Sequence, residues 1–316
     1  MKIQLVTPAP LKINNGNKIT AVRWAGILKK LGHRVRVSQS YDGKPCELLI
    51  ALHARRSYDS IQRFHDSHPN SPLIVVLTGT DVYRDIHSDA KAQRSLELAS
   101  RLVALQKMAL RELPRRLHKK TEVIYQSAEP FVGKPNRANG DFKVYVVGHL
   151  REEKDPLRTA FAVRRLPRTS RIQVTHIGQA LDEQLRMKAA QEVALNPRYR
   201  WIGQLSHRKT REQLAQSQLV CITSKMEGSS NVLSEALASG VPVICTKISG
   251  LIGTLGSKFS GYYPVGKTKQ LRKILLKAES DPRFYASLKR YCENLAYLVE
   301  PQREIDAWRR LIRQLT

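Results

Sequence analysis

The sequence predicts an α/β protein built from two doubly wound parallel sheets. Short runs rich in Val, Ile and Leu alternate with longer amphipathic stretches along the 316-residue chain, which is typical of buried parallel strands covered by helices on both faces. The alternation breaks once, at 131–141, where Gly, Pro and Asn gather and predict a linker. The chain is long enough for two domains that each bury a core.

Six apolar runs before the linker predict one sheet: Ile3–Val6, Arg34–Val37, Leu48–Leu52, Leu73–Leu77, Leu102–Leu105 and Glu122–Tyr125. Five runs after it predict a second: Lys143–Val147, Ile172–Ile177, Arg200–Ile202, Leu219–Ile222 and Val241–Cys245. Ligands of such domains bind outside the carboxyl ends of the strands. The segments that follow the strands therefore carry the candidate site residues, and we expect the active site in a cleft between the domains.

The last segment predicts an amphipathic helix with four apolar side chains on one face: Ile305, Trp308, Ile312 and Leu315. We expect a first domain at 1–138, a second domain at 139–300, and this helix at 301–316. A terminal helix that simply covers its own domain is the alternative.

The formal net charge of +27 favours anionic partners: nucleotide phosphates, an anionic membrane surface or nucleic acid. Local basic clusters lie at 115–120, 164–171 and 267–277, but aromatic residues make up only 6% and no nucleic-acid-binding motif is present, so we expect no specific nucleic-acid partner. No run approaches the ~18 apolar residues of a membrane span, and the apolar stretch at the N-terminus is too short for a signal peptide.

These features predict a soluble, cytoplasmic protein without stable membrane insertion. Its four cysteines lie far apart, which predicts reduced, structural thiols. The sequence carries no signal for an oligomeric state.

The segment from Glu227 to Glu235 carries the most specific signal. A turn at 228–231 precedes a helix, whose first-turn amides and dipole attract an anion. Glu227, before the turn, and Glu235, about two helical turns later, can accept hydrogen bonds from hydroxyls on either side of that anion. A nucleotide-sugar has this order of groups. The alternative is an ordinary helix cap followed by a solvated glutamate.

Cations follow the first strand of the second sheet, in the segment 147–156. Departure of a nucleoside diphosphate develops negative charge that fixed cations stabilise, and Lys154 and His149 are the candidates. Arg151 is a further cation on this segment. The alternative is that all three are solvated loop residues.

Loops of the first sheet offer candidate acceptor contacts. Gly16 and Asn17 follow the first strand, where a glycine lets the backbone approach an anion; a surface turn is the alternative. His53, Arg55 and Arg56 follow the third strand, and two arginines beside a histidine suit an anionic acceptor, although either arginine can instead face solvent.

Thr78, Thr80 and Asp81 follow the next strand of the first sheet. These small residues and the carboxylate could contact the reacting sugar or a water molecule. A helix cap is the alternative role for Asp81.

The segments 227–235 and 147–155 resemble two motifs of the retaining GT-B glycosyltransferases, E-x7-E and V-G-R-L-x-x-E-K-G. His149 stands where that family usually has Arg. The resemblance implies that Glu235 holds the ribose, Glu227 touches the donor sugar and Lys154 binds the diphosphate. It also implies a C-terminal helix that crosses back to the N-terminal domain. The chemistry implied needs neither a metal ion nor a cofactor, and the lack of a D-x-D pair near a strand end fits that expectation. The donor-binding residues implied are Gly203, Gln204, Gly228, Ser229, Ser230, Asn231, Val232 and Glu235.

Further motifs are VTPAP, NGN, TAVRWAGILKKLGHRV, ALHARRS, LTGTDVYRDI, AQRSLELASRLVALQ and YQSAEP. With E-x7-E, they resemble the selenosugar synthases of selenoneine biosynthesis over nearly the whole chain. That resemblance implies transfer of a sugar from UDP-N-acetylglucosamine or UDP-glucose to selenophosphate, with formation of a C–Se bond and release of UDP and phosphate. A lipid or polysaccharide acceptor is the alternative. The catalytic residues implied are Lys154, Glu227, His149 and Asp81, and the acceptor-binding residues are Gly16, Asn17, His53, Arg55, Arg56 and Thr80.

Overall fold

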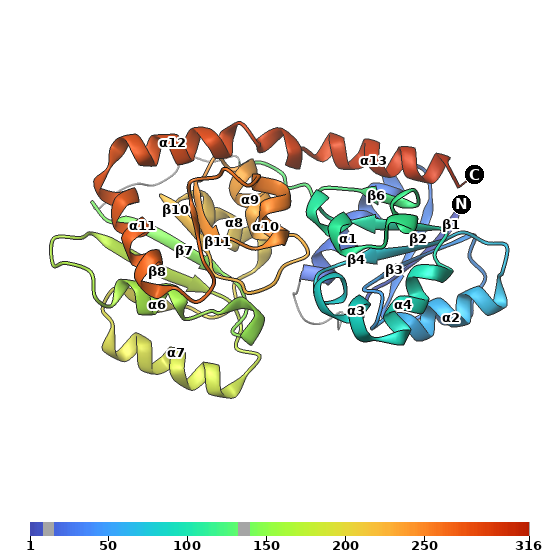
Figure 1. Ribbon diagram of the computed structural model, residues 1–316, viewed down its shortest axis with the longest axis horizontal. Coiled ribbons are helices and arrows are strands. Elements are labelled where there is room, and N and C mark those ends of the chain that lie inside the picture. Colours follow the sequence, from blue (N-terminus) through green and yellow to red (C-terminus); the bar gives the residue numbers. More distant parts are fainter. Residues whose placement is uncertain (9–15, 132–139, 316) are drawn as a thin grey trace. The chain divides into compact units, whose positions relative to one another are not determined.

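The structure is a computed structural model that describes residues 1–8, 16–131 and 140–315. The chain forms two compact units, each a parallel sheet packed between helices (Figure 1). Unit 1 contains Met1–Gln126, Glu227–Ser230 and Pro301–Thr316, and unit 2 contains Ser127–Met226 and Asn231–Glu300. The predicted α/β class with two doubly wound sheets is confirmed. Most of the predicted linker lies outside the described residues.

The sheet of unit 1 has the strand order β2-β1-β3-β4-β5-β6, with every pair parallel. The order reverses at β1, so the loops after β1 and β3 lie at the edge where doubly wound domains bind ligands. The strands are β1 (Lys2–Val6), β2 (Arg34–Ser38), β3 (Leu48–Leu52), β4 (Leu73–Leu77), β5 (Arg101–Ala104) and β6 (Thr121–Val123). The helical segments are α1 (Gly16–Lys30), α2 (Tyr58–Ser67), η1 (Asp81–Asp85), α3 (Ile86–Ser88), α4 (Ala90–Leu98), η2 (Lys107–Glu112), α5 (Arg115–His118) and α13 (Pro301–Arg313).

The C-terminal helix α13 packs on unit 1, as the resemblance implied. The rings of Trp308 and Trp24 of α1 meet edge to face at 4.8 Å. Beside them, the buried carboxylate of Glu304 accepts hydrogen bonds from Trp24 Nε1 at 2.6 Å and from Arg23 Nε at 3.0 Å. The four apolar residues predicted on one face all join the core of unit 1: Ile305, Trp308, Ile312 and Leu315.

The sheet of unit 2 has the order β12-β11-β10-β7-β8-β9, again entirely parallel. Its strands are β7 (Phe142–Val147), β8 (Ile172–Ile177), β9 (Tyr199–Trp201), β10 (Leu219–Ile222), β11 (Val243–Thr246) and β12 (Tyr262–Tyr263). Its helical segments are η3 (Glu152–Lys154), α6 (Arg158–Val163), α7 (Glu183–Leu195), α8 (His207–Ala215), α9 (Asn231–Ala238), α10 (Ser249–Leu255), α11 (Thr268–Ser280), α12 (Pro282–Glu293) and η4 (Ala296–Val299).

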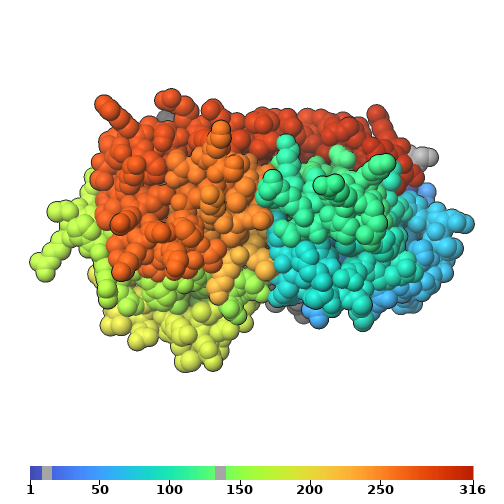
Figure 2. All heavy atoms as spheres, in the orientation of Figure 1, coloured from blue at the N-terminus to red at the C-terminus, as the bar shows by residue number. Residues whose placement is uncertain are grey.

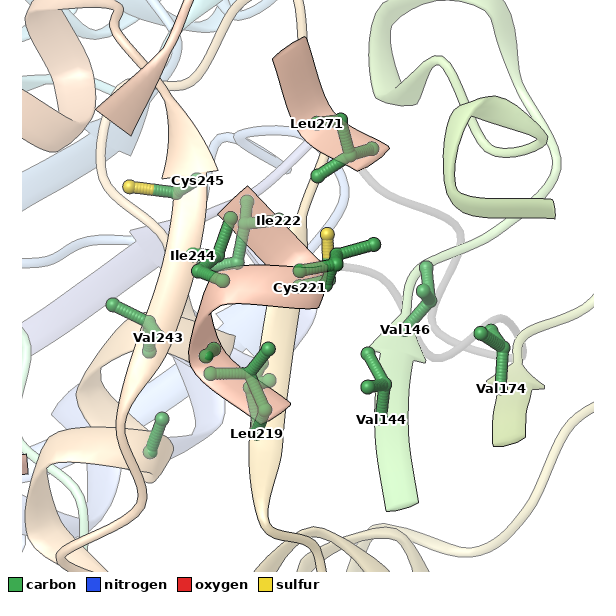
Figure 3. Packing of buried hydrophobic residues seen from close by; sticks show 14 of the residues in the cluster. Val144, Val146, Val174, Leu219, Cys221, Ile222, Val243, Ile244, Cys245 and Leu271 are labelled. Atoms are coloured by element: carbon green, nitrogen blue, oxygen red, sulfur yellow. The ribbon is translucent and has the colours of Figure 1, made fainter. Parts of the chain in front are cut away.

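The core of unit 2 is built on both faces of this sheet. Figure 3 shows the side chains of β7, β8, β10 and β11 packing with Leu271 of α11. All four cysteines are buried and free, and burial raises the pKa of Cys221 to about 12. Within the described parts of the chain, no helix combines the length and the apolar character that crossing a bilayer requires.

Candidate functional site

The two segments with the strongest sequence signal follow neighbouring strands of unit 2, β7 and β10. The strand order reverses at β7, which lies between β10 and β8, so the loops after β7 and β10 flank the switch point. Hydrogen bonds join them: Thr223 Oγ1 donates to the carbonyl of Lys154 at 2.8 Å, and Lys225 N donates to the carbonyl of Glu153 at 2.8 Å. The Lys154 loop and the strand that leads into Glu227 are therefore neighbours.

Glycines let the loop after β7 lie against the loop after β8. A Cβ atom on Gly178 would overlap the carbonyl of Gly148, so this close approach requires glycine. The next amide, that of Gln179, donates to Nδ1 of His149 at 3.1 Å and thereby orients its ring. Lys154 ends η3 on the same loop, and its stem lies near Gly148. His149 and Lys154 are thus carried by one supported loop at the switch point.

His176 of β8 lies buried beneath this loop. Its Nε2 donates to the carbonyl of Gly148 at 2.9 Å, and its Nδ1 accepts from the hydroxyl of Tyr199 at 2.8 Å. Burial lowers the pKa of His176 to about 4, so the imidazole is neutral at pH 7. The sequence pattern does not mark His176 as functional, because a histidine within an apolar strand is typical of the buried core. Its contacts make it a support for the His149 loop.

Glu235 lies on α9, which begins at Asn231 directly after the segment Glu227–Ser230. Its side chain is nearly buried, and Oε1 lies 2.8 Å from Nε2 of His207, the first residue of α8. Gly203 and Gln204, the predicted base contacts, lie in the loop that ends at His207. The structure therefore brings this loop and the predicted ribose ligand together, through a histidine that sequence analysis missed.

Gly203 shapes that loop through its backbone conformation and a backbone hydrogen bond. Its φ of +71° lies in the left-handed region that favours glycine, and its carbonyl accepts from the amide of Gly178 at 2.8 Å. Gln204 is exposed. Of these two predicted base contacts, Gly203 shapes the loop and Gln204 presents a side chain.

The first half of the motif, Glu227–Ser230, is grouped with unit 1. Glu227 is buried, and the carbonyl of Gly228 accepts from Gln106 Nε2 at 3.2 Å. Gln106 follows β5 and also bonds the hydroxyl of Tyr83 at 2.5 Å. The role of Gln106 could not be predicted from the sequence, because the contact spans 122 positions along the chain. The remaining predicted donor residues are buried or half-buried: Ser229, Ser230, Asn231 and Val232.

His53 occupies the loop after β3 in unit 1 and is only 2% exposed. Its φ of +74° places its backbone in the left-handed region. Its Nδ1 accepts from the amide of Arg56 at 3.2 Å, so Nε2 carries the proton and donates to Thr80 Oγ1 at 2.9 Å. Burial lowers the pKa of His53; Asp81 and Asp85 oppose this shift and Arg56 adds to it. The neutral ring therefore joins the loops after β3 and β4.

Asp81 joins the same two loops through backbone amides. Its fully buried carboxylate accepts from the amides of Thr78 at 2.9 Å, Gly79 at 2.7 Å and Ala54 at 3.0 Å. Three such bonds occupy much of its accepting capacity. Asp81 is the first residue of η1 and does not cap it, so its carboxylate joins two loops instead of acting as the expected cap. Its predicted role at the reacting sugar stays a prediction.

The two arginines after β3 differ in their contacts. Arg55 Nε pairs with Asp89 Oδ2 at 2.8 Å, which ties it to the residue that caps α4. Arg56 is exposed and adjoins His53 through its amide. Arg56 is therefore the better placed of the two to meet a ligand at this edge.

The loop after β1 is described only at its ends. Gly16 is exposed and opens α1, where its carbonyl accepts from Thr20 Oγ1 at 2.9 Å, and Asn17 is half-buried. The rest of this predicted loop, 9–15, lies outside the described residues.

The groups at the edge of unit 2 can neutralise a diphosphate and bind hydroxyls. Lys154 and His149 supply positive charge or donors, the start of α9 attracts an anion, and Glu235 accepts hydrogen bonds. In the described segments, no three His, Cys, Asp or Glu side chains are grouped so that they could hold a metal ion.

Residues 128–295, more than half of the chain, match the family described as "Glycosyl transferases group 1". No curated protein matches the chain.

Solved structures share its fold over almost its whole length. HepE of Anabaena, solved with UDP, has a TM-score of 0.79 at 16% identity and covers 99% of this chain and 100% of its own. Sucrose-phosphate synthase of Thermosynechococcus elongatus has a TM-score of 0.81 at 16% identity, over 99% and 98% of the two chains. A glycosyltransferase of Rickettsia africae has 0.76 at 13%, over 99% and 98%.

Proposed function

The chain belongs to the group 1 glycosyl transferases, and from that premise we propose that it transfers a sugar from a UDP-sugar to selenophosphate. The donor would be UDP-N-acetylglucosamine or UDP-glucose, and the products a 1-seleno-sugar, UDP and phosphate. One observation carries the donor half: the E-x7-E segment and the Lys154 loop arise from adjacent strands at the switch point of unit 2. HepE, which shares the fold, has been solved with UDP-glucose.

In the proposed donor complex, Glu235 accepts hydrogen bonds from the ribose hydroxyls. His207 holds its carboxylate in place from α8. Glu227, at the other end of the motif, contacts the donor sugar, and the base lies against Gly203 and Gln204. The segment from Gly228 to Val232 lines the phosphates and the sugar at the start of α9.

Lys154 and His149 would stabilise the leaving diphosphate. When the C1–O bond breaks, its electron pair passes to an oxygen of the β-phosphate, and the added negative charge strengthens every bond from a fixed cation. His149 replaces the usual arginine, so it contributes a full charge only when protonated, which a nearby diphosphate favours. Arg151 is exposed on the same loop and can add positive charge.

The acceptor half is supported by the N-terminal motifs that resemble selenosugar synthases and by the cationic loop after β3. Selenophosphate is a small polyanion, and Arg56 offers a guanidinium at the edge where a ligand would bind. His53 lies on that loop, and Thr80, which follows β4, is hydrogen-bonded to it.

Selenium in selenophosphate is already anionic and nucleophilic, so the transfer needs no general base. An electron pair on selenium forms the bond to C1 as UDP leaves. Water then cleaves the P–Se bond, phosphate is released, and the electron pair of that bond remains on selenium.

The proposal is tested by measuring UDP release from UDP-N-acetylglucosamine, UDP-glucose and UDP-galactose, each with and without selenophosphate. We expect release that depends on selenophosphate, with a product of the mass of a 1-seleno-sugar. Glu235→Ala protein serves as the control for contaminating activity. Release that is indifferent to selenophosphate would remove it as the acceptor. The lipid or polysaccharide alternative, which the basic surface favours, would then be tested with lipid extracts.

A further inference from the structure

Asp155 follows Lys154 and stands where the motif V-G-R-L-x-x-E-K-G has its final glycine. Its φ of +43° and ψ of +55° lie in the left-handed region, which only glycine enters without cost. Among the described residues other than glycine, only His53 and Asp155 have a positive φ. Aspartate tolerates this conformation better than most residues, but it persists only where neighbouring contacts hold it. The turn after Lys154 therefore depends on the contacts of Asp155.

Asp155 forms a bidentate ion pair with Arg158. Nε of Arg158 donates to Oδ2 of Asp155 at 2.8 Å, and Nη2 donates to Oδ1 at 3.2 Å. The amide of Arg158 also donates to the carbonyl of Asp155 at 3.2 Å. Only 12% of the Asp155 side chain and 22% of the Arg158 side chain are exposed. A bidentate pair that is shielded in this way fixes the relative position of its partners, which an exposed pair does not.

Arg158 connects this pair to the core of unit 2. It is the first residue of α6, and its third nitrogen, Nη1, donates to Thr268 Oγ1 at 2.7 Å. Thr268 begins α11, whose Leu271 and Leu275 are fully buried in that core. The turn after Lys154 is therefore fastened to two helices.

The backbone of Lys154 is held on both sides. Its carbonyl accepts from Thr223 Oγ1 at 2.8 Å, and the residue that follows it is fixed by Arg158. Its amide donates to the carbonyl of Arg151 at 3.1 Å. Backbone conformation limits the directions that a side chain can take, and a cation that is already in place stabilises developing charge without reorganising. These contacts therefore restrict where the Lys154 ammonium group can lie.

We propose that Asp155 and Arg158 are positioning residues that hold Lys154 in place for the β-phosphate of the nucleotide. This role rests on the proposed function, in which Lys154 binds the diphosphate. Arg158 acts through Lys154 rather than on the ligand, because all three of its nitrogens are engaged by Asp155 and Thr268. Asp155 supplies the link, since glycine at its position would allow the turn but would give Arg158 no carboxylate to bind.

Calorimetric titration of the full-length protein with UDP and with UMP tests this role without an acceptor and without turnover. UMP lacks the β-phosphate, so the ratio of the two affinities reports the contact that Lys154 makes. Lys154→Ala should lower the preference for UDP by about tenfold or more, the range for hydrogen bonds to a charged group. Asp155→Gly and Arg158→Lys should each lower it by about fivefold or more, while UMP affinity stays within about twofold of the natural protein. In a Lys154→Ala background, neither substitution should lower the preference further.

The choice of variants separates positioning from general stability. Asp155→Gly keeps the left-handed turn and removes only the carboxylate, and Arg158→Lys keeps the charge but loses the bidentate geometry. The matched control is Arg186→Lys on α7, where Arg186 forms a bidentate pair with Glu183 at the same i,i+3 spacing. That pair is exposed, and Figure 2 shows α7, in yellow, at the surface. The UDP preference of this control should equal that of the natural protein.

This proposal and the proposed function fail in different ways. If Lys154→Ala loses the UDP preference but Asp155→Gly or Arg158→Lys keeps it, the ion pair does not position Lys154, and the proposed donor site still stands. An equal fall in UMP and UDP affinity would show that the pair only maintains the fold, which also overturns the proposal. A natural UDP preference in Lys154→Ala would remove Lys154 from the diphosphate, and the proposed function would lose that residue together with its two positioning partners.

Discussion

Glu235 is the residue on which the donor half of the proposed site depends most directly. Glu235→Ala should weaken UDP binding by about 1.5–3 kcal/mol, the range for hydrogen bonds to a charged group, as measured by calorimetry. Glu227→Ala is the matched control within the motif, because this residue is assigned to the sugar: turnover should fall while UDP affinity stays nearly intact. Unchanged UDP affinity in Glu235→Ala would remove Glu235 from the nucleotide site.

His207 is expected to act through Glu235. If His207 holds the Glu235 carboxylate for the ribose, His207→Ala should weaken UDP binding by about 1 kcal/mol, and the loss should nearly vanish in a Glu235→Ala background. His207→Gln retains a donor and should recover part of the affinity. Additive losses in the double variant would show that His207 and Glu235 act independently.

The arginines after β3 are expected to differ in their effect on the acceptor. Arg56→Ala should raise the selenophosphate concentration needed for half-maximal turnover by about 30-fold or more, the equivalent of about 2–4 kcal/mol for a lost charge contact, without changing UDP affinity. Arg55→Ala should have a smaller effect, because Arg55 is paired with Asp89.

Phosphate should compete with selenophosphate but not with the UDP-sugar. Normal selenophosphate dependence in both variants would contradict the acceptor assignment.

At the residue scale, site residues could be predicted from the sequence where they lie close together along the chain. Glu227 and Glu235 belong to one continuous segment, so their spacing around a helix start can be recognised directly in the sequence. His207 lies 28 positions from Glu235, and their contact depends on how α8 packs against α9. The role of His176 could not be predicted, because the apolar pattern of its strand does not indicate that its side chain bonds to a neighbouring loop.

At the scale of elements, the strands were predicted because both sheets are parallel and buried, which gives continuous apolar runs. The differences between the predicted and the observed strands have local causes. β11 begins at Val243 rather than Val241, since Pro242 lacks an amide for the ladder. β12 has two residues, too few to form a run. The pairing of β7 with β10, which creates the switch point, joins residues 75 positions apart and could not be predicted from either strand alone.

His176 connects three elements of unit 2, and its titration should reveal that role. Its pKa of about 4 is below the ordinary 6.5, so the unfolded chain binds its proton first as the pH falls. Stability is therefore retained above pH 6.5 and lost as the pH falls toward 4, by about 2–3 kcal/mol at pH 4.5. The advantage of the natural protein over His176→Gln should shrink by that amount between pH 7 and 4.5 in urea unfolding. A constant difference would show that His176 does not titrate on unfolding.

On the scale of the whole molecule, the predicted domains are continuous segments with boundaries at 138 and 300. The two units of the structure are defined by which residues contact one another in space, so each contains separate segments of the chain. Glu227–Ser230 and Pro301–Thr316 are grouped with unit 1, although both come after unit 2 has begun. The helix at the end of the chain could be predicted from its apolar face, but its contact with α1 could not, because Glu304 and Trp24 are 280 positions apart.

This return of the chain to unit 1 leads to a stability prediction. Glu304→Ala removes the acceptor of the buried Trp24 indole and the partner of Arg23, so it should cost about 2–4 kcal/mol of unit 1 stability. The chain has three tryptophans, two of them, Trp24 and Trp308, in unit 1. In a Trp201→Phe background, fluorescence therefore reports unit 1 alone during urea unfolding.

The matched control for this variant is Asp306→Ala on the same helix, where an exposed ion pair contributes little. Its unfolding midpoint should stay close to that of the background protein. While unit 1 stays folded, UDP affinity should be nearly unchanged in both variants, because Glu235, His207 and Lys154 all belong to unit 2. If Glu304→Ala leaves the fluorescence transition where it was, the α13 contact does not hold unit 1 together, and Trp308 alone would have to account for the burial of that helix.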